Sequence, residues 1–136
     1  MLIKEFISQT NKNQMISTLL KYYKVGSVKV KQKSMKDHAH FDVDRGTLEL
    51  STKYKTIKNS QIKEFLITII HEIYHAMDAK KYGWRKFKDM YELEMNYQIA
   101  MDKDEYKDNK YEIAAEKFGQ KNYSKWLRQF KKDGLI

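Results

Sequence analysis

The segment from Ser60 to Gly83 has the pattern of a helix that is apolar on most of its sides. Asn59 or Ser60 can cap such a helix at its start, and Gly83 can end it. At about 100° per residue, its apolar side chains form one wide stripe: Ile62, Phe65, Leu66, Ile69, Ile70, Ile73 and Met77. Ile67 adds a further apolar side. We therefore expect most of the surface of this helix to be buried.

The residues before this helix predict one more helix and a small sheet. Ile16, Leu19, Leu20 and Tyr23 share one face of a helix that Gly26 interrupts. Val28 and Val30 alternate with lysines, as in a half-buried strand. Residues 39–51 alternate apolar and polar side chains on both sides of Asp-Arg-Gly, where Gly46 is free to take a positive φ. This pattern predicts a β-hairpin.

The residues after the central helix predict further helices. An amphipathic helix is expected from Trp84 to about Met101, and a polar, charged break follows at 102–109. Another helix begins near Lys110 and either continues or restarts through the apolar stripe at 123–130. No proline, repeat or low-complexity segment marks a boundary. We expect one α+β domain over residues 1–136, with an N-terminal helix, a small sheet with a hairpin, and then helices.

The central helix contains the sequence HEIYH at residues 71–75. Residues four apart lie one turn apart on the same face, so His71 and His75 can bind one metal ion of the size of Zn²⁺. Glu72 is rotated by about 100° from the first histidine. It can reach a water molecule on the ion and act as a general base. Because both histidines lie opposite the apolar stripe, the helix presents them away from that side of the core.

A catalytic zinc site usually has three protein ligands and a water molecule. One common arrangement has a third histidine six residues after the second, but that position is Lys81. No histidine follows His75 and the chain has no cysteine. The third ligand is therefore expected to be a carboxylate on a later helix.

The best source of that carboxylate is the segment YEIAAEKFG at residues 111–119. Glu112, Ala115, Glu116 and Gly119 share one helix face, and the two small residues allow a close approach to the histidine helix. One glutamate could bind the metal while the other accepts a hydrogen bond from the free ring nitrogen of a histidine. The residues alone leave open which glutamate has which role.

The two motifs together resemble the gluzincin metallopeptidases, in which HExxH is followed by a helix with an ExxxE or ExxA pattern. The chain resembles the smallest members of that group and also the ImmA/IrrE-type peptidase domain. The resemblance implies a zincin-like fold and a Zn²⁺-dependent hydrolase that cleaves protein or peptide substrates. It implies Glu112 as the third metal ligand, with Ala115 at the A position and Glu116 as the supporting residue.

The resemblance also implies how such an enzyme works. Glu72 activates the water molecule and passes its proton to the leaving amine. The substrate pairs as an extended strand with the edge of the small sheet, here Thr47 to Ser51 or a neighbouring strand. A further donor often stabilises the oxyanion, and Tyr106 is the candidate for this catalytic role, with Tyr111 as another. Because the chain has ten tyrosines, packing in the core or at the surface is the better interpretation of either one.

Four other polar residues invite a functional interpretation that the sequence favours less. His38 and His40 could form a second metal site with Asp42, but exposed hairpin residues are the better interpretation. Asp78 lies on the histidine side of the helix and could orient His71 or His75, although a solvated aspartate is an equal alternative.

The net charge of the chain suggests an alternative to a peptidase. The chain carries a net charge of +9, which suits nucleic acid or an acidic protein as a partner. The alternative is therefore a non-catalytic basic binding module with a structural metal site. The lysines are dispersed, however, which favours a solvated basic surface. The sequence shows no signal peptide and no apolar run long enough to cross a membrane, so a cytoplasmic protein without a membrane partner is expected.

Overall fold

The computed structural model describes residues 6–26 and 28–136. This part of the chain is α+β and mostly helical, with four α-helices and two small sheets, as the sequence predicts at this level. The α-helices are α1 (Gln9–Tyr22), α2 (Ile62–Tyr82), α3 (Trp84–Ala100) and α4 (Lys110–Lys132). The strands and short 3-10 helices are β1 (Phe6–Ile7), β2 (Lys29–Lys33), β3 (Ala39–Asp42), β4 (Thr47–Ser51), η1 (Thr52–Tyr54), β5 (Ile57–Lys58) and η2 (Asn59–Gln61).

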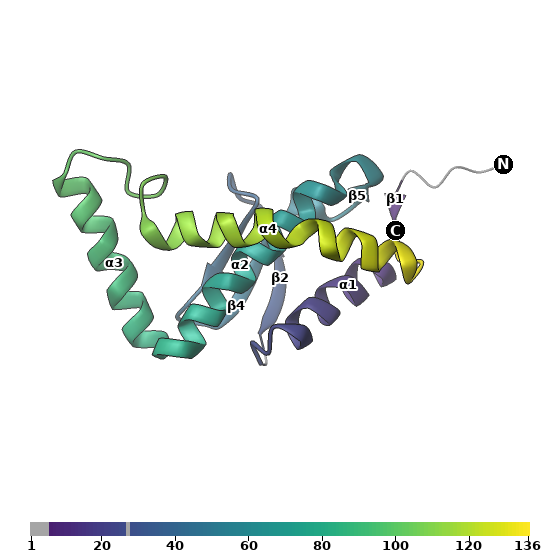
Figure 1. Ribbon diagram of the computed structural model, residues 1–136, viewed down its shortest axis with the longest axis horizontal. Helices are drawn as coiled ribbons and strands as arrows, with labels where there is room; N and C mark the ends of the chain where they lie inside the picture. The colour runs from purple at the N-terminus through teal and green to yellow at the C-terminus, as the bar shows by residue number, and fades with distance from the viewer. Residues whose placement is uncertain (1–5, 27) are drawn as a thin grey trace.

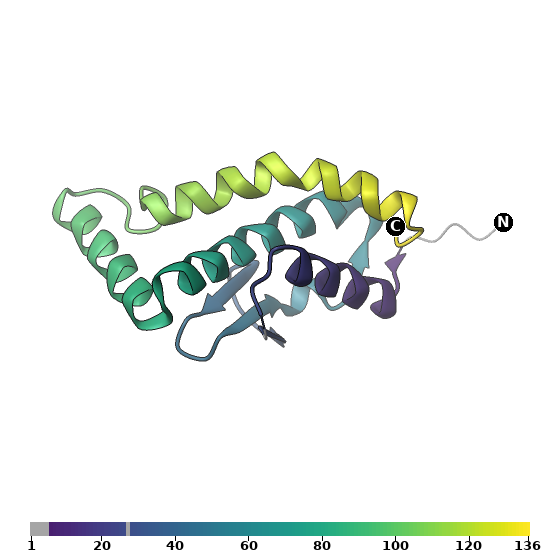
Figure 2. The same cartoon turned by 60° about the horizontal axis from the view of Figure 1, so that its bottom comes forward.

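Helix α2 lies at the centre of the fold. Figure 1 shows α4 running alongside α2, and Figure 2 shows that the strands and α1 lie on the other side of α2 from α4. Helix α3 turns away at the end of α2, and the loop at 101–109 leads back from its far end to α4. The predicted stripe on α2 supplies much of the core, since Ile62, Phe65, Leu66, Ile69, Ile70 and Ile73 are all buried. Met77 is only half-buried.

The ends of α2 differ in how well the sequence predicts them. Gly83 ends the helix as expected, and its φ of 88° lets the chain turn directly into α3. The α-helix begins at Ile62 rather than Ser60, because residues 59–61 form the 3-10 turn η2. Gln61 occupies the N-cap position, and its side-chain oxygen instead accepts a hydrogen bond from the backbone N–H of Lys58.

The predicted hairpin is present as β3 and β4. The two strands pair antiparallel, with Phe41 opposite Leu48, and Gly46 takes a φ of 61° in the turn. A carboxylate oxygen of Asp42 accepts hydrogen bonds from the backbone N–H groups of residues 44 and 45, which fixes this turn. The sheet order is β2-β4-β3, so β4 is the central strand. Thr47–Ser51 is therefore not the edge strand, and the edges are the two strands that neighbour it, β2 and β3.

Strand β2 also differs from its prediction. It pairs in parallel with β4, a long-range pairing that no local pattern indicates. The expectation of a half-buried strand at Val28 and Val30 is wrong for Val30, which is 36% exposed. The other residues of β2 are exposed as well. The reason is position, because β2 is one of the two edge strands of the sheet, and its residues Val30 and Gln32 border an open groove beside α1.

Helix α4 is one continuous helix, which settles whether it restarts near residue 123. Asn109 caps it by accepting hydrogen bonds from the backbone N–H groups of Tyr111 and Glu112. The prediction that small residues allow a close approach to α2 is confirmed at Gly119. A Cβ atom at this position would lie 2.9 Å from the backbone oxygen of Ile67.

Replacing Gly119 with alanine is expected to destabilise the fold. Alanine favours a helix by up to about 1 kcal/mol over glycine, but the added methyl group meets backbone atoms of α2 that cannot turn aside. Overpacking of this kind costs about 1–3 kcal/mol. We expect urea denaturation to show a lower free energy of unfolding for Gly119→Ala. Lys121→Ala, at an exposed site on the same helix, is the control. A Gly119→Ala protein at least as stable as the wild type would contradict this packing argument.

Candidate metal centre

Two helices bring three metal-ligating side chains together. His71 and His75 lie one turn apart on α2, and Glu112 faces them from the first turn of α4. One carboxylate oxygen of Glu112, Oε1, lies 2.9 Å from Nε2 of His71 and 2.7 Å from Nε2 of His75. All three side chains are buried. Among the residues that the structure describes, they are the one group that could hold a metal ion.

The donor set fits zinc. Two imidazole nitrogens and one carboxylate oxygen are typical ligands for a catalytic zinc ion, which keeps a fourth position open. The three ligand atoms lie within 4.8 Å of one another. Ligands of a tetrahedral zinc ion are about 3.3 Å apart, so small outward shifts of Glu112 and the histidines would admit the ion. His71, His75 and Glu112, the three ligands expected from the sequence, are thus placed where one ion can contact them all.

Two further side chains hold these ligands in position. Glu116 lies one turn after Glu112, and its Oε2 accepts a hydrogen bond of 2.9 Å from Nδ1 of His71. This contact matches the supporting role expected for Glu116. The hydroxyl group of Tyr91 on α3 donates a hydrogen bond to Oε2 of Glu112. Tyr91 has no distinguishing signal in the sequence, where its spacing with Phe87 indicates only the buried face of an amphipathic helix.

The second ring nitrogen of His75 is different. Its Nδ1 is buried and has no hydrogen-bond partner among the described residues. Asp78 follows one turn later on α2 and is half-buried, but no hydrogen bond joins it to either histidine in the described part of the chain. The structure therefore gives no support to Asp78 as the residue that orients them.

The charges of the ligands are coupled. Burial lowers the pKa of His71, but the hydrogen bond to Glu112 and the charges of Glu72 and Glu112 raise it more, to about 9. Burial raises the pKa of Glu112, and the hydrogen bonds from His71, His75 and Tyr91 outweigh this and hold it well below its usual value. A metal ion binds neutral imidazole, so it would have to displace the proton of His71. The pair of carboxylates around His71 prepares the site for a cation.

Glu72, the residue that the sequence suggests as a general base, lies beside the candidate ligands. Its carboxylate oxygen Oε1 lies 4.0 Å from Nε2 of His71, and the side chain is only 6% exposed. Burial raises its pKa, which is the direction that suits a group that must both accept and release a proton. Glu72 makes no direct hydrogen bond to the metal ligands in the described residues, which leaves its carboxylate free to act on a water molecule.

Open hollows lie on both sides of this centre. One, of about 470 Å³, is lined by His71 and Glu116, and the other, of about 380 Å³, is lined by His75 and Glu112. Both hollows are bordered by Glu72, Tyr106 and Ala39 of the edge strand β3. The ligands thus line a cleft between β3 on one side and α4 with the loop before it on the other.

Of the two tyrosines proposed for the oxyanion, Tyr106 is the one that borders the cleft. Its side chain is 56% exposed, and burial of the remainder, together with the nearby charges of Glu112 and Glu72, raises its pKa. It therefore remains a hydrogen-bond donor at neutral pH. Tyr111 instead packs against the rings of Phe87 and Tyr91.

The hairpin histidines do not form a second metal site. His38 points at Tyr54, whose hydroxyl oxygen lies 2.8 Å from its Nδ1, and it also neighbours Glu64. His40 is exposed and lies opposite Glu49 on β4. Asp42 is engaged in the hairpin turn. In the described part of the chain these three residues therefore do not converge, which agrees with the expectation of ordinary hairpin residues.

Comparisons with known proteins provide no relative from which the role of this centre could be inferred. No protein-family model matches the chain, and neither a curated protein nor a solved structure matches it significantly. Within residues 6–26 and 28–136, none of the helices combines the length and the apolar character that crossing a bilayer requires. The functional proposal therefore rests on the HEIYH motif of α2, the glutamates of α4 and the way the fold brings them together.

Replacing Tyr91 with phenylalanine is expected to weaken zinc binding about 10-fold, since loss of a group that orients a ligand costs roughly 10–100-fold in affinity. The hydroxyl group is the only part removed, and Glu112 then loses the donor to Oε2. Competition against a zinc-chelating dye measures the effect. Tyr97→Phe, at an exposed site on the same helix, should bind zinc like the wild type. Equal affinity in Tyr91→Phe would show that this hydrogen bond does not position the ligand.

Proposed function

We propose that this protein is a zinc-dependent peptidase of the gluzincin type. One observation carries the proposal, namely that the three ligands converge and that Glu72 lines the open hollows on both sides of them. A structural zinc site is normally closed by four protein ligands, whereas a catalytic site keeps an open position. Here three ligands are brought together, and a buried carboxylate lies 4.0 Å from one of them. That arrangement supports hydrolysis over a purely structural role.

The residues of the cleft have distinct roles in the proposed reaction. His71, His75 and Glu112 hold the zinc ion, which when bound polarises a carbonyl group and makes water a stronger acid. Glu72 takes a proton from the attacking water and delivers it to the nitrogen of the leaving amine. The hydroxyl group of Tyr106 donates a hydrogen bond to the oxygen on which negative charge develops.

An extended polypeptide is the substrate that fits the cleft. The sheet ends at β3, so the outer edge of this strand offers backbone N–H and C=O groups that are not paired within the sheet. Ala39 of β3 borders both hollows, which lie on either side of the metal ligands. A peptide that pairs with β3 would pass across the centre and place side chains in both hollows.

The proposal is tested with the purified protein and a mixed peptide library analysed by mass spectrometry. We expect about one equivalent of zinc per chain, with cleavage that stops when a chelator removes the metal and returns when zinc is added. Zinc bound at one equivalent without cleavage of any peptide would favour the alternative, a binding protein with a structural metal site. Cleavage that survives complete removal of zinc would refute the proposed mechanism.

A further inference from the structure

Helix α4 carries a row of positive charge on the face opposite its contacts with α2. Seven exposed cations lie on this helix, and at about 100° per residue they fall within an arc of about 120°. They are Lys110, Lys117, Lys121, Lys125, Arg128, Lys131 and Lys132. Glu112 and Glu116, the acidic residues of the helix, lie outside this arc and face the metal centre. The basic row is therefore separate from the residues of the proposed active site.

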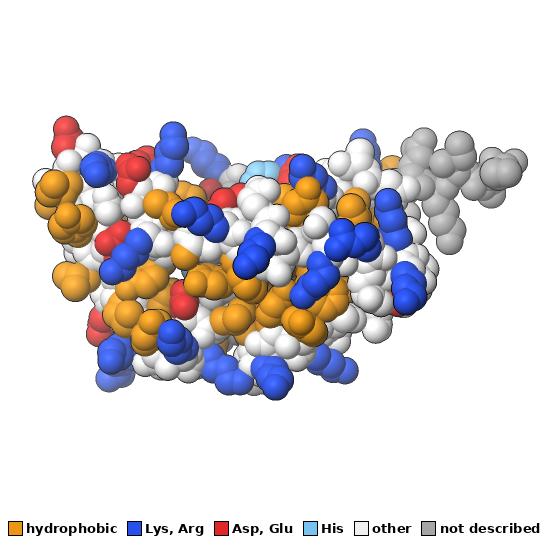
Figure 3. Space-filling view, in the orientation of Figure 1, with side chains coloured by type: hydrophobic (Ala, Val, Ile, Leu, Met, Phe, Trp, Pro, Cys, Tyr) orange, Lys and Arg blue, Asp and Glu red, His pale blue; other side chains and the backbone are white. Residues whose placement is uncertain are grey.

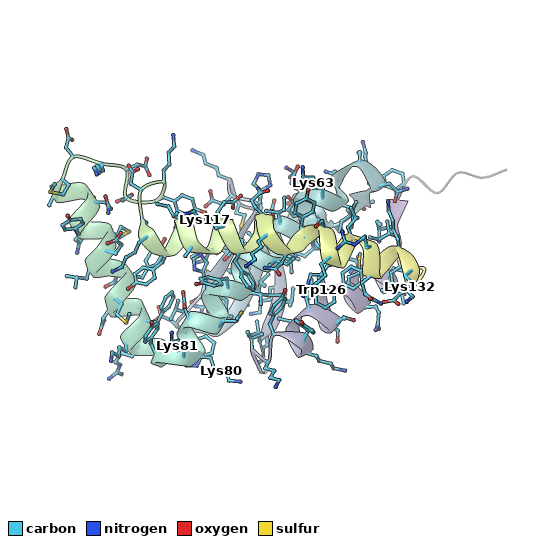
Figure 4. All side chains as sticks on the ribbon, in the orientation of Figure 1. Lys63, Lys80, Lys81, Lys117, Trp126 and Lys132 are labelled. Carbon is cyan, nitrogen blue, oxygen red and sulfur yellow. The ribbon has the colours of Figure 1, made fainter. Side chains whose placement is uncertain are left out.

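The charge of the basic row is not neutralised within the molecule. None of its seven cations forms an ion pair with a described residue. Figure 3 shows Lys and Arg side chains following α4 across the face, while most acidic side chains in this view gather near the end formed by α3. Figure 4 labels Lys117 and Lys132 of the row, together with Lys63, Lys80 and Lys81, which α2 adds to the same face.

We propose that the basic row of α4 binds the phosphate backbone of duplex nucleic acid. A helix of 23 residues is about 34 Å long, close to the roughly 34–36 Å of one turn of a DNA duplex. Cations spaced along such a line can contact successive phosphates and release their counterions. The chemistry is electrostatic and needs no base-specific contact, so the binding is independent of sequence.

The alternatives fit the surface less well. A helix that lies in a membrane surface inserts an apolar face, but the main apolar side chains of α4 are already buried, among them Ala115, Trp126 and Phe130. Among the described residues of α4, Ile113 is the only exposed large apolar side chain. A narrow, straight row of cations is most complementary to a rod-like polyanion.

The basic row lies close to the cleft, but its proposed binding of nucleic acid does not require catalysis. Lys117 borders a hollow that is also lined by His71 and Glu116. Nucleic acid on α4 would thus lie beside the metal centre, and proteins attached to it would be close to the cleft. The binding itself does not rest on the proposed peptidase activity, since no residue of the row is a metal ligand or the general base.

The test measures binding of mixed-sequence duplexes of about two helical turns, one of DNA and one of RNA, by fluorescence anisotropy. In one variant Lys117, Lys121, Arg128 and Lys132 are replaced by glutamine, which keeps helix propensity. We expect affinity to fall more than about 10-fold at about 50 mM salt, and the slope of log K against log salt to fall by about three to four. The control variant has glutamine in place of four exposed lysines on other segments: Lys31, Lys36, Lys55 and Lys86.

Both variants remove four charges from a chain of net charge +9, so an equal loss in the two would overturn the assignment to α4. Absence of duplex binding by the wild type at low salt would also overturn it, as would equal or tighter binding to polyglutamate or to phosphatidylserine vesicles. Chemical acetylation of lysines in the wild-type protein, with and without duplex, provides a second measurement. It uses no variant, so a folding defect cannot explain its result. Bound duplex should protect Lys117, Lys121 and Lys132, and unchanged labelling at all three would contradict the proposal.

Discussion

Replacing Glu72 with glutamine should reduce peptide hydrolysis by about 10³-fold while zinc stays bound. The amide has nearly the shape of the carboxylate but cannot accept a proton from water. Glu72 is not among the three residues that converge as ligands, so the zinc content should stay near one equivalent. Because burial already raises the pKa of Glu72, a neutral side chain is tolerated at this position and the fold should persist.

The measurement pairs single-turnover cleavage of the best library peptide with metal analysis of the same sample. Glu105→Gln removes the same charge from an exposed site in the loop at 101–109 and should keep full activity. Full activity in Glu72→Gln would show that Glu72 is not the base. Loss of activity together with loss of zinc would instead show that Glu72 holds the metal.

The His75→Ala variant should lose zinc and, with it, all metal-dependent cleavage. Among the described residues, His71, His75 and Glu112 are the group that could hold the ion, so two of its ligands remain. Loss of residues that merely orient a ligand costs roughly 10–100-fold in affinity, so removal of a ligand should cost more than about 100-fold. Zinc content after gel filtration and competition against a chelating dye measure the change.

The exposed residue His40 provides the matched control for this variant. His40→Ala removes an imidazole that borders the hollow beside His75 but does not belong to the three converging residues, and it should keep the zinc content of the wild type. If His75→Ala kept one equivalent of tightly bound zinc, the ion would have to be held elsewhere in the chain. Both the metal centre and the proposed peptidase would then be wrong.

The features that the sequence predicts well are those with a local periodicity. The stripe from Ile62 to Ile73 predicts α2 and its burial, because apolar side chains that share one helix face must be covered. HEIYH is equally local, since one turn of helix fixes the relation of its two histidines. The close approach of α4 at Gly119 follows from small side chains and is confirmed by the distance to Ile67.

The features that the sequence does not predict depend on contacts between distant segments. The contact of Tyr91 with Glu112 depends on the turn at Gly83 that leads from α2 into α3. In the sequence, the spacing of Tyr91 with Phe87 indicates no more than an amphipathic helix. The parallel pairing of β2 with β4 is equally hidden, and it makes β4 the central strand of its sheet. The basic row on α4 is spread over the sequence and becomes continuous only when one helix spans residues 110–132.

The separation of the proposed ligands along the chain has a consequence for chain entropy. His75 and Glu112 are 37 residues apart, and an ion that both bind would close a loop containing all of α3. By the usual polymer estimate, a cross-link over such a loop removes unfolded-state entropy worth about 4 kcal/mol. The chain has no cysteine, so zinc would act as a disulfide does elsewhere, but as a link that a chelator can withdraw. The supply of zinc would then influence how long the folded chain resists cleavage by proteases.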